Sequence, residues 1–252
     1  MKTILVLTDF SINADYMAQY ALALAQKIEA KLLVCNIYEA PNDQDRAEHN
    51  DHPFATDEED SMRDLGAVVA HLKTRLDMQK ESKSYRPEIE QCSVEGPVGG
   101  QLLDILLRHK VIFAMVSAHC RGNYVDFLRI DNTWAIIDNA NFPVLVIPYQ
   151  VRFKPYHEIG FANSILEASE EHGIRQFFEE LPFDTTYHYL KQSAKSVNID
   201  LLVIVHHKRN FFQRLFNGSM THKLATRSNT PLLVFPGTYI KEAIGALQLN
   251  SF

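Results

Sequence analysis

The sequence predicts an α/β protein with two related lobes, each a doubly wound parallel sheet. The first observation is an internal repeat, because residues 111–148 recur in outline as residues 199–236, and repeats are sought before other signals. The second is the pattern of each copy: an apolar run, a polar loop, an amphipathic segment and a second apolar run after Asn-x-Pro. Continuous apolar runs are typical of parallel strands that are buried on both faces and joined by helices.

A constant shift of 88 residues aligns the two copies without a gap. The residues that are identical under this shift are His119 and His207, Arg121 and Arg209, Thr133 and Thr221, Asn141 and Asn229, Pro143 and Pro231, Leu145 and Leu233, Val146 and Val234, and Pro148 and Pro236. We therefore expect each copy to form a strand-loop-helix-strand unit.

The first 150 residues alternate strand and helix patterns. An apolar run at 3–8 predicts the first strand, and Ser11 can cap the helix that follows it. That helix carries a buried stripe at intervals of four, three and four residues: Met17, Ala21, Leu24 and Ile28. The remaining elements are a strand at 32–37, a loop over 39–60, a helix over 61–80, a strand near 86–94 and a helix near 98–107, before the repeated unit. This order predicts a doubly wound parallel sheet.

The second lobe is shorter than the first. Residues 158–162 predict its first strand, and aligning Asn163 with Thr8 gives a shift of 155 residues. This shift exceeds that of the repeat by 67 residues, about the size of a strand-helix-strand block, so we expect this lobe to lack its second strand. Helices near 165–180 and 185–197, with a break at Pro182, would complete it. The predicted domains are residues 1–150 and 151–252.

Each lobe ends in a short apolar strand, at 144–147 and at 232–235. An apolar edge strand promotes aggregation unless another strand pairs with it or a helix covers it. We expect the two closing strands to pair across a pseudo-twofold axis, so that the chain is a pseudo-dimer of its own lobes. Whether two chains associate into a further homodimer stays open.

Composition favours a cytoplasmic protein without a membrane or nucleic-acid partner. No run approaches the roughly 18 apolar residues of a membrane span, and the first ten residues lack the features of a signal peptide. The three cysteines, Cys35, Cys92 and Cys120, lack metal-type spacing, so we expect reduced thiols. The first 150 residues carry 14 Lys and Arg against 22 Asp and Glu, and this acidic balance argues against binding to phosphate backbones.

The segment MKTILVLTDFSINADYMAQYALALAQKIEAKLLVCNIYEAP, together with the two repeated units, resembles the universal stress protein (UspA-like) family in its tandem form, with a degenerate second domain. The resemblance is strong over 1–40 and 97–148, good over 197–236 and weak over 150–196. It implies a five-stranded parallel fold of the adenine nucleotide alpha hydrolase type and dimerisation through the last strand. Some members bind ATP and others do not.

Nucleotide-binding members carry Gly-x2-Gly-x9-Gly-Ser/Thr after the fourth strand. The glycines let the backbone approach the ribose and phosphates, and the last pair presents N–H groups at a helix N-terminus. In the first lobe these positions fall on Ser117, Cys120, Ile130 and Asp131. No glycine remains, and the carboxylate of Asp131 would repel a phosphate. A helix N-cap is the simpler role for Asp131.

In the second lobe the same positions fall on Val205, Lys208, Gly218 and Ser219. Only the Gly-Ser pair remains, although Lys208, Arg209 and Arg214 can attract an anion near that helix start. The acid that contacts adenine in the family falls on Ser164, so a structural turn at Gly218 is favoured over a phosphate contact.

In the first lobe, Thr8, Asp9 and Ile37 match the family's adenine and ribose contacts. An ordinary strand-to-helix turn explains the segment from Asp9 to Ser11 equally well.

Other candidates have simpler structural roles. His206 and His207 beside Lys208 suggest a metal or phosphate site, but no third ligand has suitable spacing, so we expect solvated loop histidines. Cys120, between His119 and Arg121, is either a reactive thiol or a plain loop cysteine. We expect Phe211, Phe212, Leu215 and Phe216 to pack between the lobes, and the acidic loop 39–60 to be a solvated connector.

The sequence thus predicts a stress-response or regulatory binding module that is not an enzyme and needs no cofactor. Its partner would be an unidentified protein or small molecule. The alternative is an ATP-binding or slowly ATP-hydrolysing protein that uses Thr8, Asp9 and Ile37, or Gly218 and Ser219. A third hypothesis is redox sensing at Cys120.

Overall fold

The computed structural model describes the chain outside residues 39–57, 80–84, 97–100, 103, 106–107, 118–135, 138–139, 162–165, 190–197, 208–229 and 241–252. The chain divides into two units, Met1–Ser117 and Ala118–Phe252, and each is described by itself. The boundary expected after residue 150 falls inside the second unit, which includes the strand at 144–147. That boundary stays a prediction.

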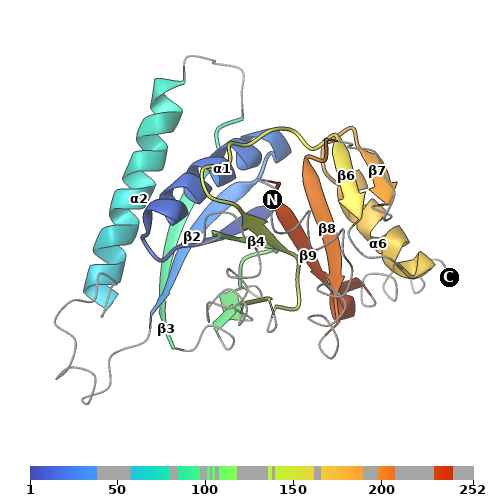
Figure 1. The fold of residues 1–252 in the computed structure, drawn as a ribbon. Coiled ribbons are helices and arrows are strands. Elements are labelled where there is room, and N and C mark those ends of the chain that lie inside the picture. The colour runs from blue at the N-terminus through green and yellow to red at the C-terminus, as the bar shows by residue number, and fades with distance from the viewer. Residues whose placement is uncertain are drawn as a thin grey trace. The chain divides into compact units, whose positions relative to one another are not determined.

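The first unit contains β1 (Thr3–Leu7), α1 (Ile12–Ile28), β2 (Lys31–Tyr38), α2 (Glu58–Met78), β3 (Ile89–Glu95) and β4 (Val111–Ser117). Its strands lie in the order β3-β2-β1-β4, and each neighbouring pair is parallel. Both β2 and β4 therefore flank β1, as the doubly wound prediction requires (Figure 1). Of the helix expected near 98–107, residues 101–102 and 104–105 are helical, and several others lie outside the described residues.

Helix α1 begins at the cap that its sequence predicts. The Ser11 Oγ accepts a hydrogen bond from the Ala14 N–H at 3.2 Å, a cap that contributes about 1 kcal/mol. The expected stripe from Met17 to Ile28 is buried. The helix ends at Glu29, whose backbone is left-handed, with φ 54° and ψ 49°.

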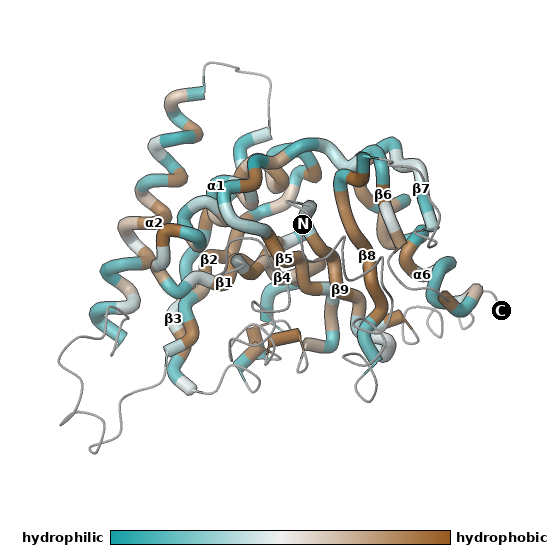
Figure 2. The backbone as a smooth tube through the Cα atoms, in the orientation of Figure 1, coloured by the Kyte–Doolittle hydropathy of each residue, from teal (hydrophilic) through white to brown (hydrophobic). Residues whose placement is uncertain are grey.

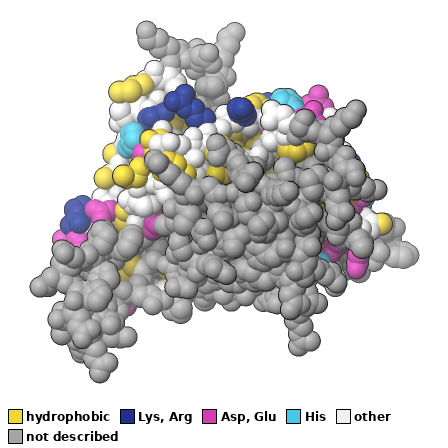
Figure 3. Space-filling model, viewed as in Figure 1, with side chains coloured by type: hydrophobic (Ala, Val, Ile, Leu, Met, Phe, Trp, Pro, Cys, Tyr) yellow, Lys and Arg dark blue, Asp and Glu magenta, His cyan; other side chains and the backbone are white. Residues whose placement is uncertain are grey.

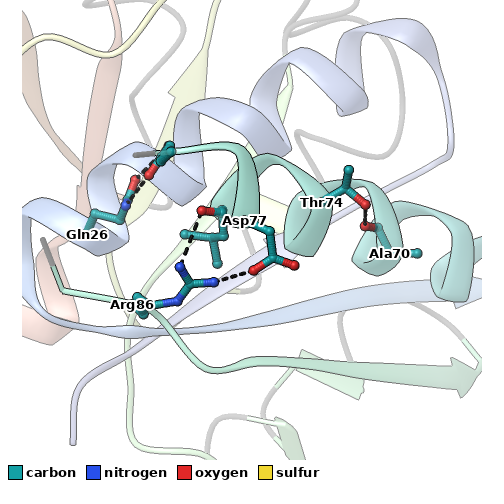
Figure 4. A network of polar contacts seen from close by, with 7 residues as sticks. Gln26, Ala70, Thr74, Asp77 and Arg86 are labelled. Carbon is teal, nitrogen blue, oxygen red and sulfur yellow. Dashed lines mark hydrogen bonds and ion pairs between the residues drawn. The ribbon is translucent and has the colours of Figure 1, made fainter. Parts of the chain in front are cut away.

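Helix α2 is amphipathic, and its residues alternate between hydrophobic and hydrophilic in Figure 2. Its buried positions include Leu65, Val69, Leu72 and Leu76. Polar contacts tie its C-terminal end to its neighbours (Figure 4): Arg86 donates to the Leu76 carbonyl at 3.4 Å, and Gln26 of α1 donates to Gln79 at 2.7 Å. These contacts are exposed or partly exposed, so each adds little to stability.

The second unit contains β5 (Val144–Ile147), β6 (Glu158–Phe161), α6 (Ala168–Glu179), β7 (Thr186–Tyr189), β8 (Leu201–His206) and β9 (Leu232–Pro236). Its strands lie in the order β5-β9-β8-β6-β7. All neighbours are parallel except β5 and β9, which pair antiparallel with Val144 opposite Val234. The expected pairing of the two closing strands is therefore confirmed.

The helix expected over 185–197 is wrong at its start, because Thr186–Tyr189 form strand β7. Residues 190–197, with the spacing that suggested the helix, lie outside the described residues. Strand β7 pairs parallel with β6 as β2 pairs with β1, so the expectation that this lobe lacks its second strand is also wrong. In the part of the chain that the structure describes, α2 and β3 have no counterpart in the second unit.

Aromatic contacts explain why this segment is a strand. The ring of Tyr187 stacks on Phe161 of β6 at 5.6 Å between centroids, and Tyr189 lies 5.4 Å from the same ring. The guanidinium of Arg175 in α6 lies over the Tyr187 ring at 4.2 Å. Tyrosines and threonines favour strands where cross-strand neighbours pack against them.

No helix among the described residues is long and apolar enough to cross a membrane. Within the same residues, no group of three or more His, Cys, Asp or Glu side chains is placed to hold a metal ion. Basic and acidic side chains both appear on the described part of the face drawn in Figure 3.

Candidate functional site

The candidate site lies at the carboxyl ends of the parallel strands of the first unit. Chain order reverses at β1, which has β2 on one side and β4 on the other. Open parallel sheets bind ligands at such switch points, outside the carboxyl ends of the strands. Thr8 and Asp9 follow β1, and Ser117 ends β4, whose register pairs Val6 with Met115. The structure therefore brings these three residues to the same edge.

The turn after β1 is closed by its own side chains. The Thr8 Oγ1 accepts the Phe10 N–H at 3.0 Å, and the Asp9 Oδ1 accepts the Ser11 N–H at 3.1 Å. Between them Phe10 has a φ of 60°, a left-handed conformation that costs an L-residue about 1 kcal/mol or more. Both polar side chains thus have a structural role in directing the chain from β1 into α1.

A buried polar network holds the same edge. The Asn36 Nδ2 of β2 donates to the Thr8 carbonyl at 2.8 Å, and its Oδ1 accepts from the Ser61 Oγ of α2 at 2.9 Å. The Ser93 Oγ of β3 donates to the Ser61 Oγ at 2.6 Å. Asn36 and Ser61 are buried, so these bonds satisfy groups that would otherwise be costly to desolvate.

Sequence reasoning missed this network. Its signal is Asn36, a polar residue inside the apolar run from Leu32 to Ile37. A buried amide requires partners, but the sequence does not show that they are the Thr8 carbonyl and Ser61 of α2. Ile37, the expected ribose contact, follows Asn36 in β2 and is half-buried, and its side chain points to the opposite face of the sheet.

Most of the second candidate site lies outside the described residues. These positions are Ser164, Lys208, Arg209, Arg214, Gly218 and Ser219, and in the first lobe Cys120, Ile130 and Asp131. The phenylalanine group at 211–216 lies outside as well. Nucleotide contacts at Gly218 and Ser219 therefore stay predictions, and so does a reactive thiol at Cys120.

The two histidines after β8 differ from the expectation of solvated loop residues. His206 is the last residue of β8 and is buried, so that expectation is wrong for it. His207 is half-exposed, and its Nε2 lies 2.9 Å from the Oε1 of Glu170 in α6. The other oxygen of Glu170 accepts the Glu167 N–H at 3.1 Å. A Cβ at Gly237 would lie 2.5 Å from the His207 Nδ1, so a larger residue there would require the His207 ring to move.

Comparisons with known proteins agree with this fold. The model of the universal stress protein family matches residues 1–148 and 185–236. No curated protein sequence matches the chain.

Solved structures include a universal stress protein from Archaeoglobus fulgidus DSM 4304, with TM-score 0.62 and 10% identity, covering 93% of this chain and 96% of that chain. A putative universal stress protein from Pseudomonas aeruginosa UCBPP-PA14 has TM-score 0.50 and 11% identity, with coverage of 99% and 98%. A universal stress protein in complex with cAMP has TM-score 0.40 and 16% identity, with coverage of 58% and 96%.

Proposed function

Because this chain belongs to the universal stress protein family, we propose that it is a regulatory binding protein that neither requires ATP nor catalyses a reaction. The observation that carries the proposal is Ser117. This residue is 5% exposed at the end of β4, where the nucleotide-binding motif has its first glycine. A buried side chain at this position opposes the close backbone approach that the motif's glycines allow.

The rest of the motif supports the same conclusion. The sequence places Cys120, Ile130 and Asp131 at the other motif positions of the first lobe, so none of the motif's glycines remains there. Thr8 and Asp9 are needed by the turn itself, which accounts for them without a nucleotide.

The pairing of β5 with β9 supports a pseudo-dimer within one chain. In family members that dimerise through the last strand, a second chain would supply the strand that β9 supplies here. We place the protein in the cytoplasm, with an unidentified protein or small molecule as its partner.

Titration calorimetry of the nucleotide-free protein with ATP tests the proposal. We expect no saturable heat of binding. Saturable binding that Asp9→Asn abolishes would overturn it, because this variant keeps an oxygen for the Ser11 N–H and removes only the charge. Asp77→Asn, at an exposed carboxylate on α2, is the matched control and should change nothing.

Nucleotide binding is the second candidate function. It is favoured by the position of Thr8 and Asp9 at the switch point, directly before the N-terminus of α1, where a helix attracts anions. Under this alternative the calorimetric titration saturates, and phosphate release from ATP shows whether hydrolysis follows.

A further inference from the structure

Two of the three cysteines lie side by side on adjacent strands of the first unit. Cys35 of β2 and Cys92 of β3 are direct register partners in a parallel pair. Neighbouring strands lie about 4.8 Å apart, which is within the range of Cα separations that a disulfide spans. Residues paired in this way point to the same face of the sheet. Both thiols are free in this structure.

The two cysteines differ in exposure and acidity. Cys35 is buried, whereas Cys92 is partly exposed. The pKa of Cys92 is lowered to about 7, chiefly by its interaction with the Cys35 thiol and also by the positive charge of Arg108, against the effects of burial and of Asp104. The same interaction, together with burial, raises the pKa of Cys35, whose thiol donates to the Asn36 carbonyl at 3.8 Å. At neutral pH the accessible sulfur is therefore a partial thiolate beside a protonated, buried partner.

We propose that Cys35 and Cys92 form a redox pair, in which a peroxide oxidises Cys92 and Cys35 resolves the product to a disulfide. This assignment rests on the register of β2 and β3 and on the unequal exposure of the two thiols. It is independent of Cys120 and of nucleotide binding.

The chemistry balances with hydrogen peroxide as the oxidant. The Cys92 thiolate attacks one peroxide oxygen, an S–O bond forms as the O–O bond breaks, and the departing hydroxide takes a proton to become water. Cys92 is then a sulfenic acid. The Cys35 sulfur attacks the Cys92 sulfur, the S–S bond forms as the S–O bond breaks, and the second hydroxide leaves as water with the Cys35 proton. Two thiols lose two electrons, and one peroxide yields two waters.

The test treats the reduced, full-length protein with one equivalent of hydrogen peroxide. We expect free thiols to fall from three to one, and peptide mapping without reductant to show Cys35 joined to Cys92. Dithiothreitol should restore all three. Three thiols that persist, or a disulfide that includes Cys120, would overturn the proposal, and this measurement on the native protein requires no variant.

Variants separate the two roles. Cys120→Ser, the matched control, should keep the disulfide. Cys35→Ala should stop at the sulfenic acid on Cys92, which dimedone traps, and Cys92→Ala should give neither product. Trapping at Cys35 or Cys120 instead of Cys92 would contradict the assignment.

Alkylation provides a readout that packing alone would not change. In Cys120→Ser, the rate of Cys92 alkylation by iodoacetamide should be half-maximal near pH 7 and fall below it, because protonation removes the thiolate. Adding Cys35→Ala removes the group that contributes most to lowering the Cys92 pKa, so the midpoint should move to higher pH. A midpoint that does not move contradicts the proposed coupling.

Discussion

Asn36 connects four segments of the first unit through single hydrogen bonds. Its amide joins the end of β1 to α2, and through Ser61 to β3. The bonds of Asn36 are buried, and one of them ends on the carbonyl of Thr8, in the turn that carries Asp9. Asn36 therefore supports the geometry of the candidate site from within the core.

Replacing Asn36 with alanine should lower the free energy of unfolding by about 1–3 kcal/mol, because the Thr8 carbonyl and the Ser61 hydroxyl lose a buried partner. Urea unfolding followed by circular dichroism measures the change. Gln79→Ala removes an exposed amide pair with Gln26 and should change stability by less than about 0.5 kcal/mol. Equal effects of the two variants would show that the network does not hold this edge.

At the scale of elements, the sequence predicts those helices and strands whose conformation depends on residues close together in the chain. The stripe of α1, its Ser11 cap and the apolar strands β1, β2, β4, β5, β8 and β9 all follow from spacing and composition. Strand β7 does not, because its conformation depends on contacts of the Tyr187 and Tyr189 rings with Phe161, which lies in another strand. His206 illustrates the same limit, since its burial follows from where β8 ends and not from its polar neighbours.

Helix α1 offers a test of how an element ends. Glu29 is exposed and left-handed, a conformation that costs an L-residue about 1–2 kcal/mol and glycine almost nothing. Glycine also has more conformational freedom in the unfolded chain, and this offsets part of the gain. On balance, Glu29→Gly should stabilise the protein by about 0.5–1 kcal/mol. Lys27→Gly, two residues earlier and within the helix, should destabilise it by about 1 kcal/mol. Urea unfolding confirms the expectation if the free energy of unfolding rises in Glu29→Gly and falls in Lys27→Gly. A lower free energy of unfolding in both variants contradicts it.

At the scale of the whole molecule, the repeat predicts two related lobes, and the two apolar closing strands predict that they pair with each other. The candidate site is predicted less completely. Thr8, Asp9 and Ser117 are found at one edge, as strand ends in a parallel sheet must be, but the network that holds Thr8 runs from Asn36 of β2 to side chains of α2 and β3. Such contacts between segments distant in sequence follow from packing in three dimensions, which periodicity along a single chain does not reveal.

The antiparallel pairing of β5 with β9 predicts whether the protein is a monomer or a dimer. Within one chain each apolar strand covers an edge of the other, so the full-length protein should be a monomer of 28.8 kDa. A chain that stops after residue 150 keeps β5 and loses β9, and the uncovered edge should drive self-association. Light scattering after size exclusion measures both masses over a range of concentrations. A stable dimer of the full chain, or a shortened chain that stays monomeric, would show that covering these edges does not control assembly.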